Sequence, residues 1–152
     1  MRFGTRLAVA AISSLMLCAS ASAQMAARAE HELFAEVNQA RRTYGLPALR
    51  WDESLAAAAR QHAAVMAQHG EAEHVFAGEA TVSARVKQAG ARFSWLAENV
   101  AQGPAASFIH AEFMKSPNHR ANVLDGDMDS IGVGVVTRGQ QLFVVEDFSK
   151  AR

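Results

Sequence analysis

The sequence predicts an α+β fold, in which helices come first and an antiparallel sheet is completed late in the chain. Three stretches before residue 116 place apolar residues at helical spacing, and glycine or proline bounds each of them. Two apolar runs, 131–137 and 141–148, follow and are separated by a short segment that contains glycine. Strands joined this closely pair as a hairpin, so the C-terminal part of the chain supplies the sheet.

Two helices are predicted in the first half of the chain. Apolar residues recur at helical spacing over residues 33–44, and Gly45 ends the pattern. A second apolar stripe spans residues 55–69, with Asp52 placed as its N-cap and Gly70 as its closing glycine. The loop that follows lacks any periodicity.

The second half of the chain alternates short helices with extended segments. Helices are expected over residues 82–89 and 104–115, and residues 94–100 are predicted to be a strand or an extended segment. Ser116 and Pro117 then favour a new helix, because serine can cap a helix and proline suits its first turn. The first of the late strands begins soon afterwards, so this helix has only one or two turns.

The N-terminus has the features of a secretory signal peptide, predicted over residues 1–23. Two arginines precede an apolar stretch, and a small-residue cleavage site ends at Ala23. Cleavage there leaves residues 24–152 as a single exported domain, located in the periplasm or outside the cell. The one cysteine, Cys18, leaves with this leader, so the exported domain is disulfide-free.

Composition argues against two classes of partner. The chain has 15 basic and 15 acidic residues, and no basic patch that would predict a nucleic-acid surface. The leader is too short for a membrane span with a stop-transfer flank, and no second long apolar run follows it. We therefore expect no nucleic-acid partner and no membrane span after the leader is removed.

Histidines and acids supply the candidates for chemistry. His119 falls near the start of the short Ser-Pro helix, where the positive end of the helix dipole favours the neutral imidazole that a metal ligand or base requires. A histidine that only hydrogen-bonds a loop is the simpler alternative. Glu98 lies in an apolar stretch, so its carboxylate is either half-buried with a partner or turned to solvent from a strand. We interpret His62 as a core or cavity-wall residue and His69 as a helix-end residue favoured by the dipole.

Five blocks of sequence, taken in order, resemble the bacterial, SCP-like branch of the CAP superfamily. This superfamily groups cysteine-rich secretory proteins, antigen-five allergens and plant pathogenesis-related proteins. The resemblance runs from about Leu33 to Phe148 and implies an exported CAP domain over 24–152. It also implies an α-β-α sandwich, with a central antiparallel sheet between helices. The blocks are VNQARRTYGLPALRWDESLAAAARQHAAVMA (37–67), EH (73–74), AENVAQG (97–103), SPNHRANVL (116–124) and IGVGVV (131–136).

The resemblance implies a cleft lined by two histidines and two acids. Three of the four positions map onto His74, Glu98 and His119. The fourth, the second acid, falls on Ser116, and Glu112 is the nearby acid that can substitute for it, although the pattern does not imply this. A cleft of this kind implies zinc or another divalent cation as the candidate cofactor.

Two further residues of the family pattern have a structural interpretation. We expect Asn38 to hydrogen-bond backbone from inside the first helix. Trp51 is expected to fill core. Neither is assigned to the site.

Three functions remain open. The favoured hypothesis is a binding module for a divalent metal, a small hydrophobic ligand or a cell-envelope component. The second is a peptidase-like hydrolase in which His74 and His119 hold a metal and Glu98 is the candidate base. The third is a surface interaction protein with a relic cleft, and the fold does not choose among them. A zinc hydrolase needs both metal ligands and a separate base, so a serine at position 116 predicts a poor hydrolase or none.

Overall fold

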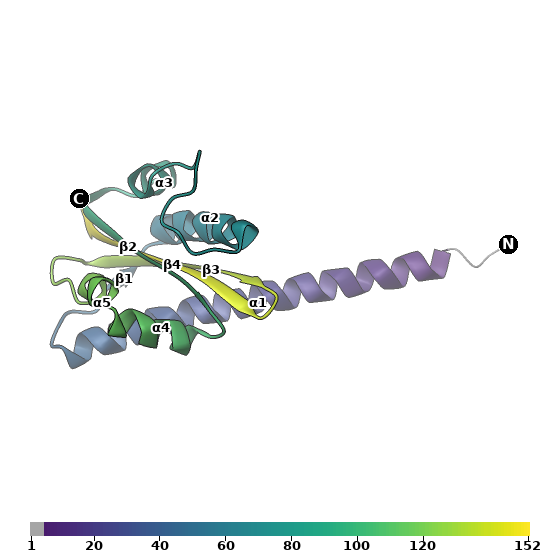
Figure 1. Ribbon diagram of the computed structural model, residues 1–152, viewed down its shortest axis with the longest axis horizontal. Helices are drawn as coiled ribbons and strands as arrows, with labels where there is room; N and C mark the ends of the chain where they lie inside the picture. The colour runs from purple at the N-terminus through teal and green to yellow at the C-terminus, as the bar shows by residue number, and fades with distance from the viewer. Residues whose placement is uncertain (1–4) are drawn as a thin grey trace.

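The computed structural model describes the backbone from Thr5 to Arg152 and the side chains from residue 21 onward. Figure 1 shows the chain. Helices dominate the first part and the two longest-paired strands come last, which confirms the predicted α+β class. The elements of the described part are α1 (Thr5–Thr43), β1 (Arg50–Trp51), α2 (Glu53–His69), α3 (Val82–Gln88), β2 (Phe93–Gly103), α4 (Ala106–Lys115), α5 (Pro117–Val123), β3 (Ser130–Arg138) and β4 (Gln141–Ala151).

The strands form one sheet in the order β1-β3-β4-β2. β3 and β4 pair as the predicted antiparallel hairpin, and β2 pairs antiparallel with the other side of β4. These three strands are the expected central antiparallel sheet. The two-residue β1 adds a parallel edge beside Ser130 and Ile131, which makes the sheet mixed. β1 was not predicted from the sequence, because two residues are too few to show an alternating pattern.

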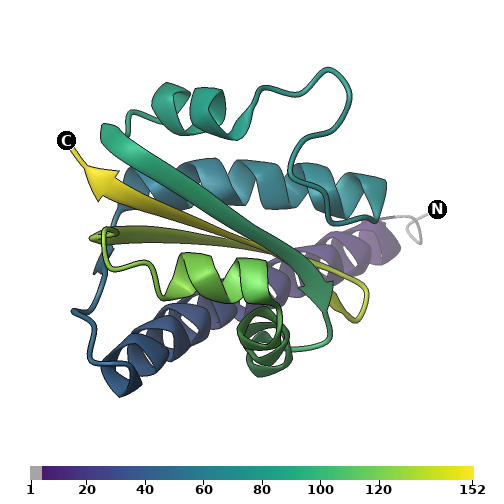
Figure 2. The same cartoon turned by 60° about the vertical axis from the view of Figure 1, so that its left-hand side comes forward.

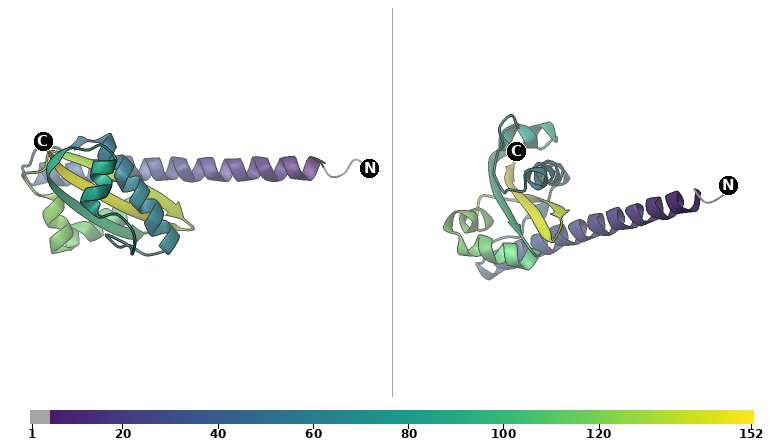
Figure 3. Two further views of the ribbon diagram at one scale, coloured as in Figure 1. Left: turned by 90° about the horizontal axis from the view of Figure 1, so that it is seen from above. Right: turned by 45° about the vertical axis from the view of Figure 1, so that its right-hand side comes forward.

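Helices cover both faces of the sheet, which confirms the α-β-α sandwich. Figure 2 shows α2 and α3 on one side of the strands and α1, α4 and α5 on the other, and Figure 3 shows the same layers from two further directions. One core cluster joins α1 and α4 to the sheet through residues such as Val133 and Val144. A second joins α2 to the sheet through Val145 and Phe143.

Two glycines of β3 allow α2 to lie directly on the strand. A Cβ atom at Gly132 would come within 2.1 Å of the Ala56 backbone nitrogen, and one at Gly134 within 2.2 Å of the Ala59 carbonyl carbon. Real side-chain atoms do not approach backbone this closely, so larger residues would push the helix away. The IGVGVV block therefore sets the distance between α2 and the sheet.

Most element boundaries follow the predicted signals. Asp52 caps α2, with its Oδ1 accepting from the backbone N–H groups of Ser54 at 2.8 Å and Leu55 at 3.1 Å. Gly70 ends α2 with a positive φ of 79°. The predicted capping bond at Ser116 is wrong: its side chain makes no such bond. Ser116 also ends α4, and its backbone N–H donates to the Glu112 carbonyl oxygen at 3.1 Å.

Helix α1 is longer than the predicted first helix, because it runs without interruption from Thr5 to Thr43. Its N-terminal half extends beyond the sheet in Figure 1. Within the described residues, no helix combines the length and the apolarity that a membrane crossing requires. Residues 1–4 of the predicted leader lie outside the described residues, as does the side chain of Cys18, and cleavage after Ala23 stays a prediction.

The interpretations of Asn38 and Trp51 agree with their contacts. The Asn38 side chain donates to the Leu49 carbonyl at 3.1 Å and accepts from the Leu49 N–H at 2.7 Å, which confirms its backbone-bonding role. Trp51 is partly buried and packs edge-on against Phe34, with ring centroids 5.4 Å apart. Arg41, to which we assigned no role from the sequence, is fully buried. It donates to the carbonyl oxygens of Pro47, Val123, Asp125 and Met128.

Candidate functional site

The three residues mapped from the resemblance come from three elements around the edge strand β2. Glu98 lies within β2, His74 lies in the loop between α2 and α3, and His119 is the third residue of α5. Glu98 lies directly opposite Asp147 of β4, and Asp147 lies directly opposite Gly132 of β3. A Cβ atom at Gly132 would point to α2, and residues directly opposite one another share a face of the sheet. Successive strand residues point to opposite faces. Glu98 therefore faces the α2 and α3 side, and the next residue along β2 faces the α4 and α5 side.

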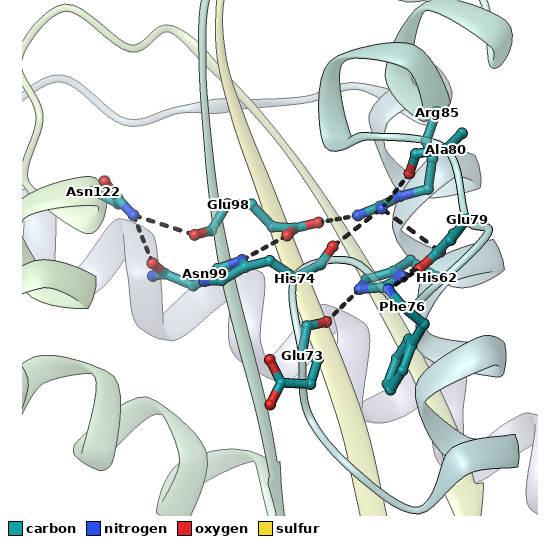
Figure 4. Close-up of polar contacts among 10 residues, drawn as sticks. All are labelled: His62, Glu73, His74, Phe76, Glu79, Ala80, Arg85, Glu98, Asn99 and Asn122. Atoms are coloured by element: carbon teal, nitrogen blue, oxygen red, sulfur yellow. Dashed lines mark hydrogen bonds and ion pairs between the residues drawn. The ribbon is translucent and has the colours of Figure 1, made fainter.

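Glu98 and His74 are in direct contact. The His74 Nδ1 lies 2.7 Å from the Glu98 Oε1, and the Glu98 side chain is 3% exposed while that of His74 is 54% exposed (Figure 4). Glu98 is thus a buried carboxylate with a partner, the first of the two alternatives left open by the sequence. When Nδ1–H donates to the carboxylate, the Nε2 lone pair of His74 is left for an incoming group. The hydrogen bond that it donates to Glu98 raises the pKa of His74.

Arg85 on α3 holds the other oxygen of Glu98. Its Nη2 donates to the Glu98 Oε2 at 2.6 Å, and its side chain is only 6% exposed. Its Nη1 donates to the carbonyl oxygens of His74 at 3.1 Å and Ala80 at 3.0 Å. Arg85 therefore fixes both the carboxylate and the loop that carries His74. Sequence reasoning missed it, because α3 shows only a surface-like mixture of basic and apolar residues.

A second buried acid lies beside this pair. Asp147 is 1% exposed and sits opposite Glu98 on β4. Burial, and next the charge of Glu98, raise the pKa of Asp147 well above its ordinary value, while Arg85 opposes the shift. One arginine thus faces Glu98 and Asp147, and its Nη1 also lies 3.6 Å from the Glu79 Oε1. Consecutive acids in the apolar β4 segment were a usable sequence signal for this arrangement.

The loop that carries His74 is anchored by His62. The His62 ring is fully buried, with Nδ1 at 2.6 Å from the Glu79 Oε1 and Nε2 at 2.7 Å from the Glu73 carbonyl oxygen (Figure 4). Glu79 also accepts from the Phe76 N–H at 3.0 Å. His62 is therefore a core residue, as predicted. It fixes the loop on both sides of His74.

His119 approaches from the opposite side of β2. Its ring packs against Phe113, with centroids 5.0 Å apart. Burial lowers the pKa of His119, and the charge of His74 lowers it further. The neutral form expected from the helix dipole is thus favoured, with burial and the second histidine as its causes. The two imidazoles lie within each other's electrostatic field, although no direct bond joins His119 to Glu98 among the described contacts.

An asparagine pair ties α5 to β2. The Asn99 side chain donates to the His119 carbonyl oxygen at 3.2 Å and accepts from the Asn122 side chain at 2.8 Å. Asn122 also donates to the Glu98 carbonyl oxygen at 3.3 Å. These bonds fix the position of His119 relative to Glu98.

Glu112 does not join this cluster in the described contacts. Its carboxylate accepts from the Lys115 ammonium at 2.7 Å, and both side chains are largely exposed, at 48% and 73%. Ser116, where the family pattern has its second acid, ends the same helix. The structure thus brings His74 and Glu98 together, sets His119 nearby, and leaves Glu112 on the surface.

The donor set is smaller than a three-residue metal site needs. Among the side chains described, no group of three or more histidine, cysteine, aspartate or glutamate residues is placed to hold a metal ion. Both oxygens of Glu98 are engaged, by His74 and by Arg85. The remaining donors are the imidazole nitrogens of His74 and His119.

The chain is similar to proteins of one family. The family model described as the cysteine-rich secretory protein family, CAP, matches residues 34–148. An outer surface protein of Borrelia burgdorferi superposes with a TM-score of 0.75 at 21% identity, covering 82% of this chain and 94% of that one. An extracellular protein of Bacillus anthracis that contains an SCP domain gives 0.76 at 24% identity, covering 85% and 42%. A cysteine-rich secretory protein of Staphylococcus aureus gives 0.63 at 16%, covering 82% and 39%.

This chain spans less than half of the Bacillus and Staphylococcus chains, at 42% and 39% of their lengths. No curated protein matches the chain significantly. At identities of 16% to 24% the solved structures establish a shared fold.

Proposed function

Because the chain belongs to the cysteine-rich secretory protein (CAP) family, we propose that it is an exported binding module in which His74 and His119 take a divalent cation such as zinc. The observation that carries this proposal is the engagement of Glu98. With one oxygen on His74 and the other on Arg85, Glu98 orients an imidazole and has no free oxygen for another task. A carboxylate behind a ligating histidine is a common supporting arrangement in metal sites.

The coordination positions that the two histidines leave free would accept the ligand. Two protein ligands leave sites where a polar group of a cell-envelope component, or of a small hydrophobic molecule, can complete the coordination. A site with two protein ligands holds its ion weakly, so the cation and its ligand are expected to bind together. A surface interaction role for the same fold remains the second binding hypothesis.

Hydrolysis is the less favoured function, because it requires a base beside the metal ligands. Glu98 is the only mapped candidate, and it is already bound to Arg85. We expect zinc-loaded protein to turn over peptide and ester libraries no faster than the Glu98→Gln and Glu112→Gln variants. Turnover that is clear in the wild type and absent from the Glu98 variant would establish the hydrolase.

Export is proposed from two features. The predicted leader over residues 1–23 has a charged start, an apolar stretch and a small-residue end. Two of the proteins similar in fold are described as an outer surface protein and an extracellular protein. The intact mass of the exported protein should correspond to a chain that begins at Gln24 and contains no thiol. A mass that retains Cys18 with an added lipid would contradict this processing.

A further inference from the structure

The sheet has a second edge, opposite β2, that is only partly covered. β1 pairs with β3 only at Ser130 and Ile131, while β3 continues to Arg138. In the part of the chain that the structure describes, the outer side of β3 beyond β1 has no neighbouring strand. An edge with unpaired N–H and C=O groups accepts another extended chain unless something covers it.

The register of the hairpin shows which groups face outward. Arg138 and Gln141 flank a two-residue turn and therefore exchange backbone hydrogen bonds with each other. Because these directions alternate along a strand, Val135 and Thr137 present their N–H and C=O groups to the outer side. The bond from the Val135 N–H to the Glu30 Oε1, at 3.2 Å, agrees with this assignment.

A single ion pair covers the edge at Val135. Glu30 on α1 accepts from the Nε of Arg60 on α2 at 2.9 Å and from its Nη2 at 2.8 Å. This pair links the two helices across the strand. Within the described residues, no hydrogen bond is made to the outward backbone N–H of Thr137.

Hollows lie on both sides of the uncovered segment. In the full chain one of about 600 Å³ lies between α1 and β3, with Ser22, Ala23, Ala26 and Ala27 of α1 in its wall. The other, of about 470 Å³, lies between β3 and α2, with Ala64 in its wall. Both are lined by Val136 and Thr137. Side chains of a strand point alternately to its two faces, so an added strand would find room for both sets.

We propose that the outer edge of β3 over Val135–Arg138 binds an extended peptide segment of another protein as an added strand. The Val135 carbonyl and the Thr137 N–H pair with the peptide backbone, and the two hollows receive small or apolar side chains. An extended backbone is the occupant this edge selects, because its polar groups repeat at the spacing of β3 itself. In the full chain the Ser22 hydroxyl contacts the Thr137 hydroxyl, and removal of the predicted leader would uncover that end.

The test uses capped pentapeptides of alternating valine and threonine, with nuclear magnetic resonance titration of the isolated protein. We expect amide shifts centred on Val135–Arg138. Two further peptides carry N-methyl groups on one or the other alternate set of amides. One set faces β3 and the other faces away, so one methylated peptide should bind at least about tenfold more weakly and the other should be unchanged.

Variants at Thr137 supply the matched comparison. Thr137→Pro removes the outward N–H without removing a bond to β4, and should weaken the unmodified peptide about tenfold. Thr137→Val keeps that N–H and should stay within about twofold. Equal binding of both methylated peptides, shifts elsewhere in the protein, or no binding by the wild type would overturn the proposal. If Thr137→Pro fails to fold, the methylated pair still decides.

Discussion

Replacing Arg85 by methionine is expected to destabilise the protein by about 3 to 5 kcal/mol, the usual loss when one partner of a buried ion pair is removed. Arg85 is the cation that faces two buried acids, Glu98 and Asp147. Without it Asp147 and Glu98 stay in the interior, and Glu98 keeps only the half-exposed His74 as a partner. The loss should shrink at low pH, where carboxyl groups become protonated. Denaturant unfolding at several pH values measures it.

A surface pair provides the control for Arg85. Lys115→Met removes the partner of Glu112, and both side chains are exposed, so the change should stay below about 1 kcal/mol. A double variant, Arg85→Met with Glu98→Met, should lose less than the single Arg85 variant, because no buried charge is left behind on Glu98. A loss at Arg85 as small as that at Lys115 would show that the buried network contributes little.

Glu146→Gln is expected to stabilise the protein at alkaline pH. Glu146 is fully buried on β4, where its Oε2 accepts from Asn99 at 3.2 Å and its Oε1 has no partner among the described groups. Burial raises the pKa of Glu146 from 4.5 to about 8. The native state therefore holds a proton that the unfolded chain releases near pH 4.5, and native stability falls as pH rises from there to about 8.

The size of this effect follows from the shift. A change of pKa from 4.5 to about 8 corresponds to roughly 4 to 5 kcal/mol. Glutamine keeps the shape of the protonated acid and does not titrate. We expect the stability of the wild type to fall between pH 5 and 9 by several kcal/mol more than that of the variant. Exposed Glu112→Gln should leave the slope unchanged, and parallel curves for the wild type and Glu146→Gln would contradict the assignment.

The fold was largely predictable because its signals are local. Asp52 and Gly70 bound α2 through bonds to residues within four positions of each, so the sequence itself carries the information. β1 was missed because it exists only through pairing with Ser130 and Ile131, 80 residues away. The predicted capping bond at Ser116 was wrong because this one residue connects two helices, so that it ends α4 as well as preceding α5.

The site was predictable only in part. The family resemblance mapped His74, Glu98 and His119, and the structure places the first two in contact. Arg85 was missed because its role comes from packing of α3 against β2, which no short stretch of sequence encodes, and Asp147 was missed although two consecutive acids in an apolar strand were a signal for it. These two residues change the chemistry, since Arg85 takes the oxygen that would have made Glu98 a free ligand or base.

Zinc titration by calorimetry tests most directly whether His74 and His119 form a cation site. We expect one ion per chain, with a dissociation constant of about 1 μM or higher. This affinity is weaker than that of structural zinc sites with four protein ligands. His74→Ala and His119→Ala should each lower the affinity by about tenfold or more, whereas His69→Ala, whose ring stacks on Phe76 outside the site, should not.

The zinc affinity should also depend on pH. Because the pKa of His74 is raised above 6.5, protons compete with zinc for this ring up to a higher pH than usual, and the zinc affinity should keep rising above neutrality. Binding in the wild type that both variants lose, with apo melting temperature unchanged in His119→Ala, is the predicted result; no zinc binding, or binding that survives both substitutions, would contradict it.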